Sequence, residues 1–352
     1  MNGIPLILIC ALFFAKNGLA QQRVNMEDVR LIQQDSLQQV DVFVGGKLFT
    51  TYIYRTGSMK KPVLFPINSA DGQTITRGYP LATRPGERID HPHHYGLWFN
   101  HGVVNGVDFW NNSDAIPESK RNRFYGSIFH QRIDRMADGD PGVLAVEKTW
   151  IMPDGSVVLD EKTEYRFRGG AGYRQIDHTT MLTAREKPVE FTDSKEGMFA
   201  LRVARQLELP DDEAVFLTDS SLQISAEKIA DPACCTGNYL NSEGLVGNDV
   251  WGKRARWVKL AGQLDGTPVA LVIFDFPTNP NYPPHWMARG YGLFGVNPFG
   301  TKIYDPEAEA LNFSLAPGAS VQFRHRVLIF SGKDPDRETI ETAYQEFCQE
   351  KN

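Results

Sequence analysis

Hydrophobic and polar residues alternate along most of this chain, and the alternation predicts a protein built from β-strands. Val40–Val44 and Lys47–Tyr54 flank Gly45-Gly46, the pattern of a β-hairpin with a two-residue primed turn. Other alternating runs stand between turns rich in Gly, Pro, Asn and Asp, as in sandwiches and barrels. They are Val143–Ile151 and Val157–Phe167, which form a second hairpin, and Ile176–Leu182, Phe199–Leu207, Arg256–Leu260, Val269–Phe274, Leu311–Leu315 and Val321–Phe330.

Only the C-terminal segment has a convincing helical pattern. Ile340, Ala343, Tyr344 and Phe347 recur at helical spacing, and Asp336 stands before them as a candidate N-cap. We therefore expect one helix that packs across a sheet and closes the fold. Since the chain shows no repeat, linker or abrupt change of composition, the pattern predicts a single large antiparallel β domain with a C-terminal helix.

The N-terminus is typical of a secretory signal. Ile4–Ala15 is an apolar run, shorter than the ~20 residues that cross a bilayer. Gly18-Leu19-Ala20 follows as a small-x-small cleavage pattern. We expect residues 1–20 to be removed and residues 21–352 to form the exported domain, secreted or periplasmic. No later apolar stretch is long enough to span a membrane.

Composition narrows the choice of partner. The chain has 37 Lys and Arg against 43 Asp and Glu, a net charge of −6, with 41% hydrophobic residues. These values exclude collagen-like, coiled-coil and wholly disordered proteins. The mild negative charge offers no general attraction to nucleic acid, which is not expected as a partner. Cys234, Cys235 and Cys348 remain after signal removal, an odd number that favours packed thiols over a disulfide framework.

The densest cluster of reactive side chains is segment 90–102, DHPHHYGLWFNHG. Four of the eight histidines, His91, His93, His94 and His101, fall within eleven residues. If the segment is extended, His91 and His93 share one face, which suits two metal ligands completed by a third residue. The same placement suits proton transfer or substrate contact, because imidazole titrates near neutral pH. A purely structural role in a tight loop is the third possibility.

Other segments could bring further groups to the same ligand. Glu196 and Glu243 each lie on a loop that ends in glycine, where a side chain can face a ligand. Glu196 could be a general base that the adjacent Lys195 keeps ionised, or one half of a solvated ion pair. Segment 279–300 is rich in Pro and Gly and is predicted to be an ordered loop rather than a strand. The remaining candidate contacts in these segments are Arg77, Arg202, Arg254, His285, Trp286 and Arg289.

Aromatic residues lie among these polar groups. Asn105-Gly106-Val107-Asp108-Phe109-Trp110 follows the histidines, and Trp251 and Tyr291 occur in the later segments. A sugar stacks its C–H face on rings while its hydroxyls pair with Asn, Asp and Arg. Aromatic loops of this kind also occur simply as core.

Four ordered motifs resemble the bacterial PmoA-like family of domains of unknown function. They are DHPHHYGLWFNHGVVNGVDFW, SKEGMFALR, SEG…WGKRARWV and NPNYPPHWMARGYGLFGVNPFG, and the resemblance extends from about Arg77 to Arg326. The family is often labelled methane oxygenase. A methane monooxygenase subunit is an integral membrane protein, and no span follows the predicted signal here, so we reject that activity.

The resemblance implies a β-supersandwich of the galactose-mutarotase type and a sugar or oligosaccharide ligand in an exported compartment. In mutarotase-like folds a His acid and a Glu base act on opposite sides of the anomeric centre. Carried over by role, His93 or His94 is the acid and Glu196 or Glu243 the base. The resemblance also implies that Arg77, Lys195 and Arg202 hold polar groups of the ligand.

Three functions remain open at this point. The leading hypothesis is an exported enzyme that acts on a carbohydrate by proton transfer, as an epimerase or as a lyase or dehydratase, without a cofactor. Such chemistry needs an acid, a base and a cation near the developing oxyanion. The alternatives are a non-catalytic glycan-binding protein and a metal-dependent hydrolase or oxygenase with a divalent ion on His91 and His93. Hydrolysis by paired carboxylates is disfavoured, because no acidic pair stands out.

Overall fold

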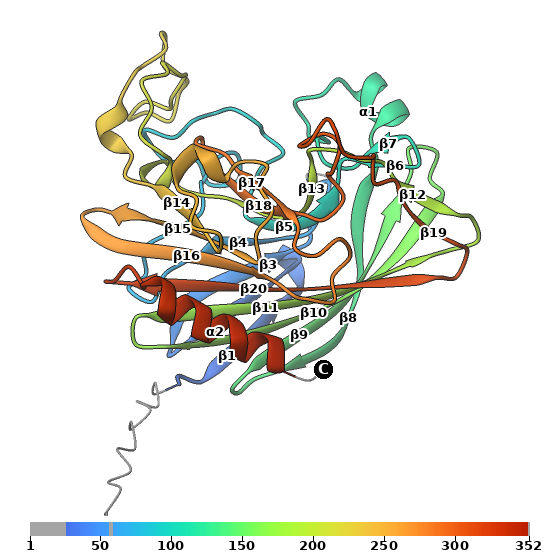
Figure 1. Ribbon diagram of the computed structural model, residues 1–352, viewed down its shortest axis with the longest axis horizontal. Helices are drawn as coiled ribbons and strands as arrows, with labels where there is room; N and C mark the ends of the chain where they lie inside the picture. The colour runs from blue at the N-terminus through green and yellow to red at the C-terminus, as the bar shows by residue number, and fades with distance from the viewer. Residues whose placement is uncertain (1–25, 56–58, 351–352) are drawn as a thin grey trace, which may run out of the picture.

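Two eight-stranded antiparallel sheets dominate the computed structural model, which describes residues 26–55 and 59–350 (Figure 1). The predicted all-β class is therefore confirmed. The predicted signal, residues 1–20, lies outside the described residues. In the part of the chain that is described, no helix is both long and apolar enough to cross a membrane.

The first sheet carries the candidate site and has the strand order β1-β2-β3-β4-β5-β13-β18-β17. The predicted hairpin is confirmed in it, with Gly45 and Gly46 at φ 57° and 77°, the left-handed region that a primed turn requires. Its strands are β1 (Val29–Gln34), β2 (Gln39–Val44), β3 (Lys47–Ile53), β4 (Val63–Ile67), β5 (Leu97–His101), β13 (Gly197–Arg202), β17 (His285–Ala288) and β18 (Leu293–Asn297).

Two predictions about this sheet were wrong. Segment 279–300 is not only a loop, because β17 and β18 pair within it, with His285 opposite Asn297. Both strands are buried along their whole length, so they show no alternation that a sequence pattern could reveal. The run predicted as strand 199–207 also ends early, since a 3₁₀-helix, η2 (Arg205–Leu207), follows β13.

The second sheet has the order β14-β15-β16-β20-β11-β10-β9-β8 and contains most of the long alternating runs that the sequence predicts. Its strands are β8 (Ser127–Ala137), β9 (Gly142–Ile151), β10 (Val157–Gly170), β11 (Tyr173–Ala184), β14 (Asn238–Asn241), β15 (Trp257–Leu264), β16 (Thr267–Asp275) and β20 (Ser320–Ser331). Side chains from the inner faces of both sheets form the main core. Phe49 and Phe167, for example, meet edge to face at 6.2 Å across it.

The C-terminal helix α2 (Arg337–Gln349) is confirmed and lies along the outer face of the second sheet (Figure 1). The Asp336 carboxylate accepts a hydrogen bond from the Thr339 N–H, which is the predicted cap. Ile340, Tyr344 and Phe347 bury the apolar stripe against β16 and β20.

The short helix α1 (Glu118–Phe124) was not predicted, because none of its residues is buried and it has no apolar stripe. Cys234, Cys235 and Cys348 are free thiols, as expected. The remaining elements are β6 (Val103–Val104), β7 (Val107–Asp108), β12 (Val189–Phe191), β19 (Phe313–Leu315), η1 (Asp35–Leu37), η3 (Pro232–Cys234) and η4 (Gly247–Val250).

Candidate functional site

A small cavity of about 100 Å³ brings together residues from all four sequence motifs. The histidines come from the loop before β5, Glu196 directly precedes β13, and Arg289 follows β17. β5 pairs with β13, and β18 lies between β13 and β17, so these four strands bring the three segments to one part of the first sheet. Six predicted site residues line the cavity: His91, His93, His94, Lys195, Glu196 and Arg289.

Two buried arginines, Arg77 and Arg202, hold the histidine loop in place through hydrogen bonds. Arg77 Nη1 donates to Asp90 Oδ1 at 2.5 Å, and its Nη2 donates to the carbonyl oxygens of His91 and His94 at 2.9 Å each. Arg202 Nη2 donates to the same Asp90 oxygen at 2.8 Å. The two arginines are 1% and 0% exposed. They were predicted to contact substrate, but they lie beneath the histidine loop and do not line the cavity, so we assign them as positioning residues.

The histidine loop is a turn and not the extended segment on which the predicted pairing of His91 with His93 was based. His91 has φ 44°, and the His94 N–H donates to the His91 carbonyl at 2.9 Å. As a result the rings of His91 and His94 are parallel, with centroids 4.8 Å apart. His93 stands edge-on to both, and Tyr291 stacks on the other side of His91 at 5.1 Å.

Asp90 and His91 form a dyad. His91 Nδ1 lies 3.1 Å from Asp90 Oδ2, and the His91 side chain is 40% exposed. Burial raises the pKa of Asp90, but the hydrogen bond from His91 and the charges of Arg202 and Arg77 outweigh it and hold that pKa well below its usual range. The permanent carboxylate keeps the proton on Nδ1, which leaves Nε2 as the nitrogen available to a ligand.

His93 and His94 are buried too deeply for the proton-donor role that was predicted for them. Burial, helped by the Lys61 charge, lowers the pKa of His93 to about 2. Burial likewise lowers the pKa of His94 well below its usual value, and Trp110 Nε1 donates to His94 Nε2 at 3.1 Å. Both imidazoles are therefore neutral at physiological pH, and the dyad residue His91 is the better candidate for proton transfer.

Glu196 lies at the same cavity, and its pKa is shifted in the direction opposite to the predicted one. Burial and the nearby Asp108 raise its pKa, although Lys195 and a hydrogen bond from Asn111 Nδ2, at 3.2 Å from Glu196 Oε2, lower it. Lys195 is exposed, so its charge is screened by water and does not outweigh burial. Glu196 is therefore better suited to donate a proton than to act as the base predicted from the sequence.

Besides Arg77 and Arg202, five predicted site residues do not line this cavity. His101, His285 and Trp286 are buried, and each donates a ring N–H to a backbone carbonyl at 2.8 Å. Glu243 and Arg254 lie on exposed loops elsewhere. The predicted metal pair also lacks support, because within the described ranges no three His, Cys, Asp or Glu residues are grouped to hold an ion.

The cavity wall contains residues that sequence reasoning passed over. The Arg289 guanidinium lies over the Trp251 ring, 3.3 Å from its centroid, and this cation–π contact holds the two side chains together. Three of these residues, Trp110, Trp251 and Tyr291, belong to the aromatic motifs, and that was the sequence signal by which they could have been assigned to the site. Asn111, Met287 and Leu293 carried no such signal. The additional lining residues are Trp110, Asn111, Trp251, Met287, Tyr291 and Leu293.

Replacing Arg77 by methionine is expected to lower the free energy of unfolding by about 3 kcal/mol, because the buried carbonyls of the histidine loop lose their donors. Urea unfolding followed by tryptophan fluorescence measures this. Arg254→Met, at an exposed arginine, is the matched control and is expected to change stability by under about 0.5 kcal/mol. A loss below about 1 kcal/mol for Arg77→Met would show that the loop holds itself without this anchor.

Comparison with known proteins places the chain in a family without describing its activity. The profile of a family of unknown function matches residues 39–345. No curated protein matches the sequence significantly. Because the matching family has no described function, the resemblance to PmoA-like proteins stays an expectation.

Several solved structures are similar at low identity. One is the galactosidase domain of the α-galactosidase-sucrose kinase AgaSK, with 9% identity and a TM-score of 0.38 over 86% of this chain and 42% of that chain. Another is the GH36 α-galactosidase AgaA from Geobacillus stearothermophilus, with 9% identity and a TM-score of 0.37 over 81% and 40%. A galactose mutarotase-like protein from Clostridium acetobutylicum has 10% identity and a TM-score of 0.27 over 86% and 98%. The chain thus spans about two fifths of the two galactosidases.

Proposed function

The chain belongs to this family, the family of unknown function DUF6807, and we propose that it is a carbohydrate-active enzyme that moves a proton to or from a sugar bound beside His91. The observation that carries the proposal is the Asp90–His91 dyad at one small cavity with Glu196. A neutral imidazole oriented by a carboxylate is a general base, and a carboxyl with a raised pKa is a general acid.

A sugar fits the remaining wall of this cavity. The rings of Trp110, Trp251 and Tyr291 offer surfaces for C–H groups, and Asn111 offers an amide for a hydroxyl. The volume of about 100 Å³ is below the ~300–1,000 Å³ of sites that enclose drug-sized ligands. The site would therefore hold one terminal sugar unit and leave the rest of a glycan outside.

The geometry supports chemistry at a carbon next to a carbonyl or carboxylate group. His91 takes the proton from that carbon, and the C–H electrons form an enolate whose oxygen is stabilised by Lys195 or Arg289. Glu196 then gives a proton to the opposite face of the carbon, which is epimerisation, or to a leaving oxygen, which is elimination. We place this reaction outside the cytoplasm, in keeping with the signal expected at residues 1–20.

Solvent exchange tests the proposal on many candidate sugars at once. The protein is incubated in heavy water with a panel of neutral aldoses, uronates and oligouronides, and each sugar is examined by NMR for carbon-bound deuterium and for unsaturated products. We expect exchange or elimination with at least one panel member. The rate should fall as pH rises through the raised pKa of Glu196, because the donor is then deprotonated.

The same panel of sugars also tests a second function, glycan binding without catalysis. The contact between Arg289 and Trp251 favours this function too, because a fixed ring and cation can bind a sugar without reacting with it. Binding of a panel sugar with no exchange and no new product at any pH would contradict the enzyme proposal and support this second function.

A further inference from the structure

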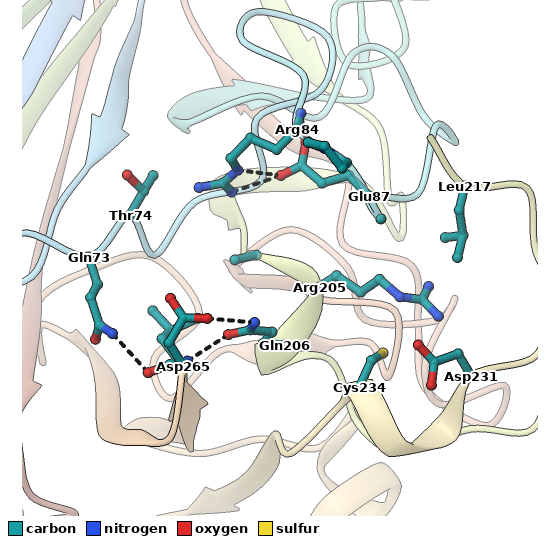
Figure 2. Close-up of a pocket in the computed structure, with 14 residues that line it drawn as sticks. Gln73, Thr74, Arg84, Glu87, Arg205, Gln206, Leu217, Asp231, Cys234 and Asp265 are labelled. Carbon is teal, nitrogen blue, oxygen red and sulfur yellow. Dashed lines mark hydrogen bonds and ion pairs between the residues drawn. The ribbon is translucent and has the colours of Figure 1, made fainter. Parts of the chain in front are cut away.

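A second and larger cavity, of about 380 Å³, lies beyond the C-terminal end of β13, where Arg205 follows the strand. It shares no lining residue with the cavity at His91. Its wall comes from the loop after β4, the segment 84–87, η2 and η3. Figure 2 shows Arg205 extended from η2 towards Leu217 and Asp231, away from the Gln206–Asp265 pair.

Arg205 is buried in this wall without a partner. It is 9% exposed, its Nη1 has no hydrogen-bond partner, and no ion pair or hydrogen bond joins its guanidinium to any residue in 26–55 or 59–350. By contrast Arg84, the other arginine of this wall, forms an ion pair with Glu87 at 2.7 Å. A buried charge without a counter-ion costs free energy, so a protein that retains one has a use for it.

The surroundings of Arg205 carry an excess of positive charge. The buried Glu208 interacts electrostatically with Arg205, but Arg88 lies 2.8 Å from its carboxylate and Arg202 lies 3.6 Å from it. Arg202 in turn shares Asp90 with Arg77. Four buried arginines therefore face three carboxylates in this cluster, those of Asp90, Glu208 and the exposed Glu213, which lies 3.7 Å from Arg88. An anion bound at Arg205 would reduce the imbalance. The four are Arg77, Arg88, Arg202 and Arg205.

The cavity also contains hydrogen-bond acceptors without donors, which a ligand with hydroxyl groups would satisfy. Gln73 donates its amide to the Leu264 carbonyl at 2.8 Å, which leaves the buried Gln73 Oε1 without a donor. The Asp231 carboxylate lines the cavity beyond ion-pair distance of Arg205. A plain inorganic anion would repel Asp231 and leave Gln73 Oε1 unsatisfied, whereas a sugar acid supplies hydroxyl donors to both.

We propose that this cavity binds an acidic saccharide, with its carboxylate or sulfate on Arg205 and its hydroxyls on Gln73 and Asp231. A volume of about 380 Å³ lies in the range of ligand sites and accommodates a sugar unit with a neighbour. The proposal is independent of the reaction at His91, because it concerns binding alone and the two cavities have no lining residue in common.

The first test compares galacturonate, galactose and inorganic sulfate at equal ionic strength, with the thermal midpoint and calorimetric titration as readouts. We expect galacturonate to raise the midpoint of the full chain and galactose to have no effect at the same concentration. Arg205→Met should weaken galacturonate binding at least tenfold, because a charge-assisted pair is lost. It should fold as stably as the parent, since the guanidinium has no partner to lose. Arg254→Met, at an exposed arginine outside the cavity, should bind normally.

Cys234 provides a second readout that needs no variant. It lines the cavity, whereas Cys348 lies on α2. Galacturonate should slow the alkylation of Cys234 by iodoacetamide, read by peptide mapping, and leave Cys348 unchanged. Unprotected Cys234, or unaltered galacturonate binding in Arg205→Met, would overturn the proposal and assign any binding to the His91 cavity. Protection by sulfate but not by galacturonate would overturn the assignment to a sugar.

Discussion

Replacement of His91 by alanine is expected to lower the rate of proton transfer by about 10²- to 10⁴-fold, the usual contribution of a general acid or base. His91 is the only histidine of the 90–102 segment that combines an exposed ring with a carboxylate partner, at 3.1 Å. The fold should survive, because Asp90 keeps Arg77 and Arg202. The measurement is kcat and kcat/KM on the sugar that shows solvent exchange, with circular dichroism as the check on folding.

Two glutamates allow a matched comparison, since Glu196 lines the cavity and Glu243 does not. Glu196→Gln removes the proton donor and should reduce turnover to a similar extent, without the alkaline loss of activity that marks the parent. Glu243→Gln changes the other carboxylate singled out in the motifs, which lies on an exposed loop outside the cavity, and should leave turnover unchanged. Full activity in His91→Ala, or lost activity in Glu243→Gln, would refute the assignment of the site.

The protein is expected to lose several kcal/mol of stability between pH 7 and pH 5. Burial lowers the pKa of His93 to about 2 and that of His101 to about 4, and it lowers the pKa of His94 and His178 as well. Below ~6.5 these histidines take up protons in the unfolded chain but not in the folded one. Stability therefore falls with falling pH, by about 1.4 kcal/mol per pH unit for each histidine.

Buried acids act in the opposite direction and limit this loss. Burial raises the pKa of Glu208 and Asp275, so each stabilises the folded state at low pH and loses that contribution as pH rises through its folded pKa. The histidines outnumber them, which makes the net effect a loss in acid. Urea unfolding at pH 7, 6 and 5 and constant ionic strength measures the slope. His101→Gln should reduce it by one proton, and equal stability at all three pH values would show that the histidines are not buried as neutral groups.

Whether a strand could be predicted from the sequence depends on whether one of its faces is exposed to solvent. Strands with one face in the core and one in solvent alternate, as β10 does with its pattern of buried and partly exposed positions. Strands β13, β17 and β18 are covered on both faces, so they carry apolar runs without a period, and the pattern either misplaced their ends or missed them. The strands that are buried on both faces are therefore the hardest to predict from the sequence, although they carry the site.

The amino-acid sequence by itself determined that this is a β protein with a closing helix and that its reactive side chains gather in four short segments. Periodicity and local clustering are properties of neighbours along the chain, so a sequence contains them in full. Only the tertiary structure decided which clustered residues can act. The pKa values of Asp90, His93 and Glu196 depend on burial and on groups such as Lys61, Asp108 and Arg202, which are distant in sequence and are brought together only by folding.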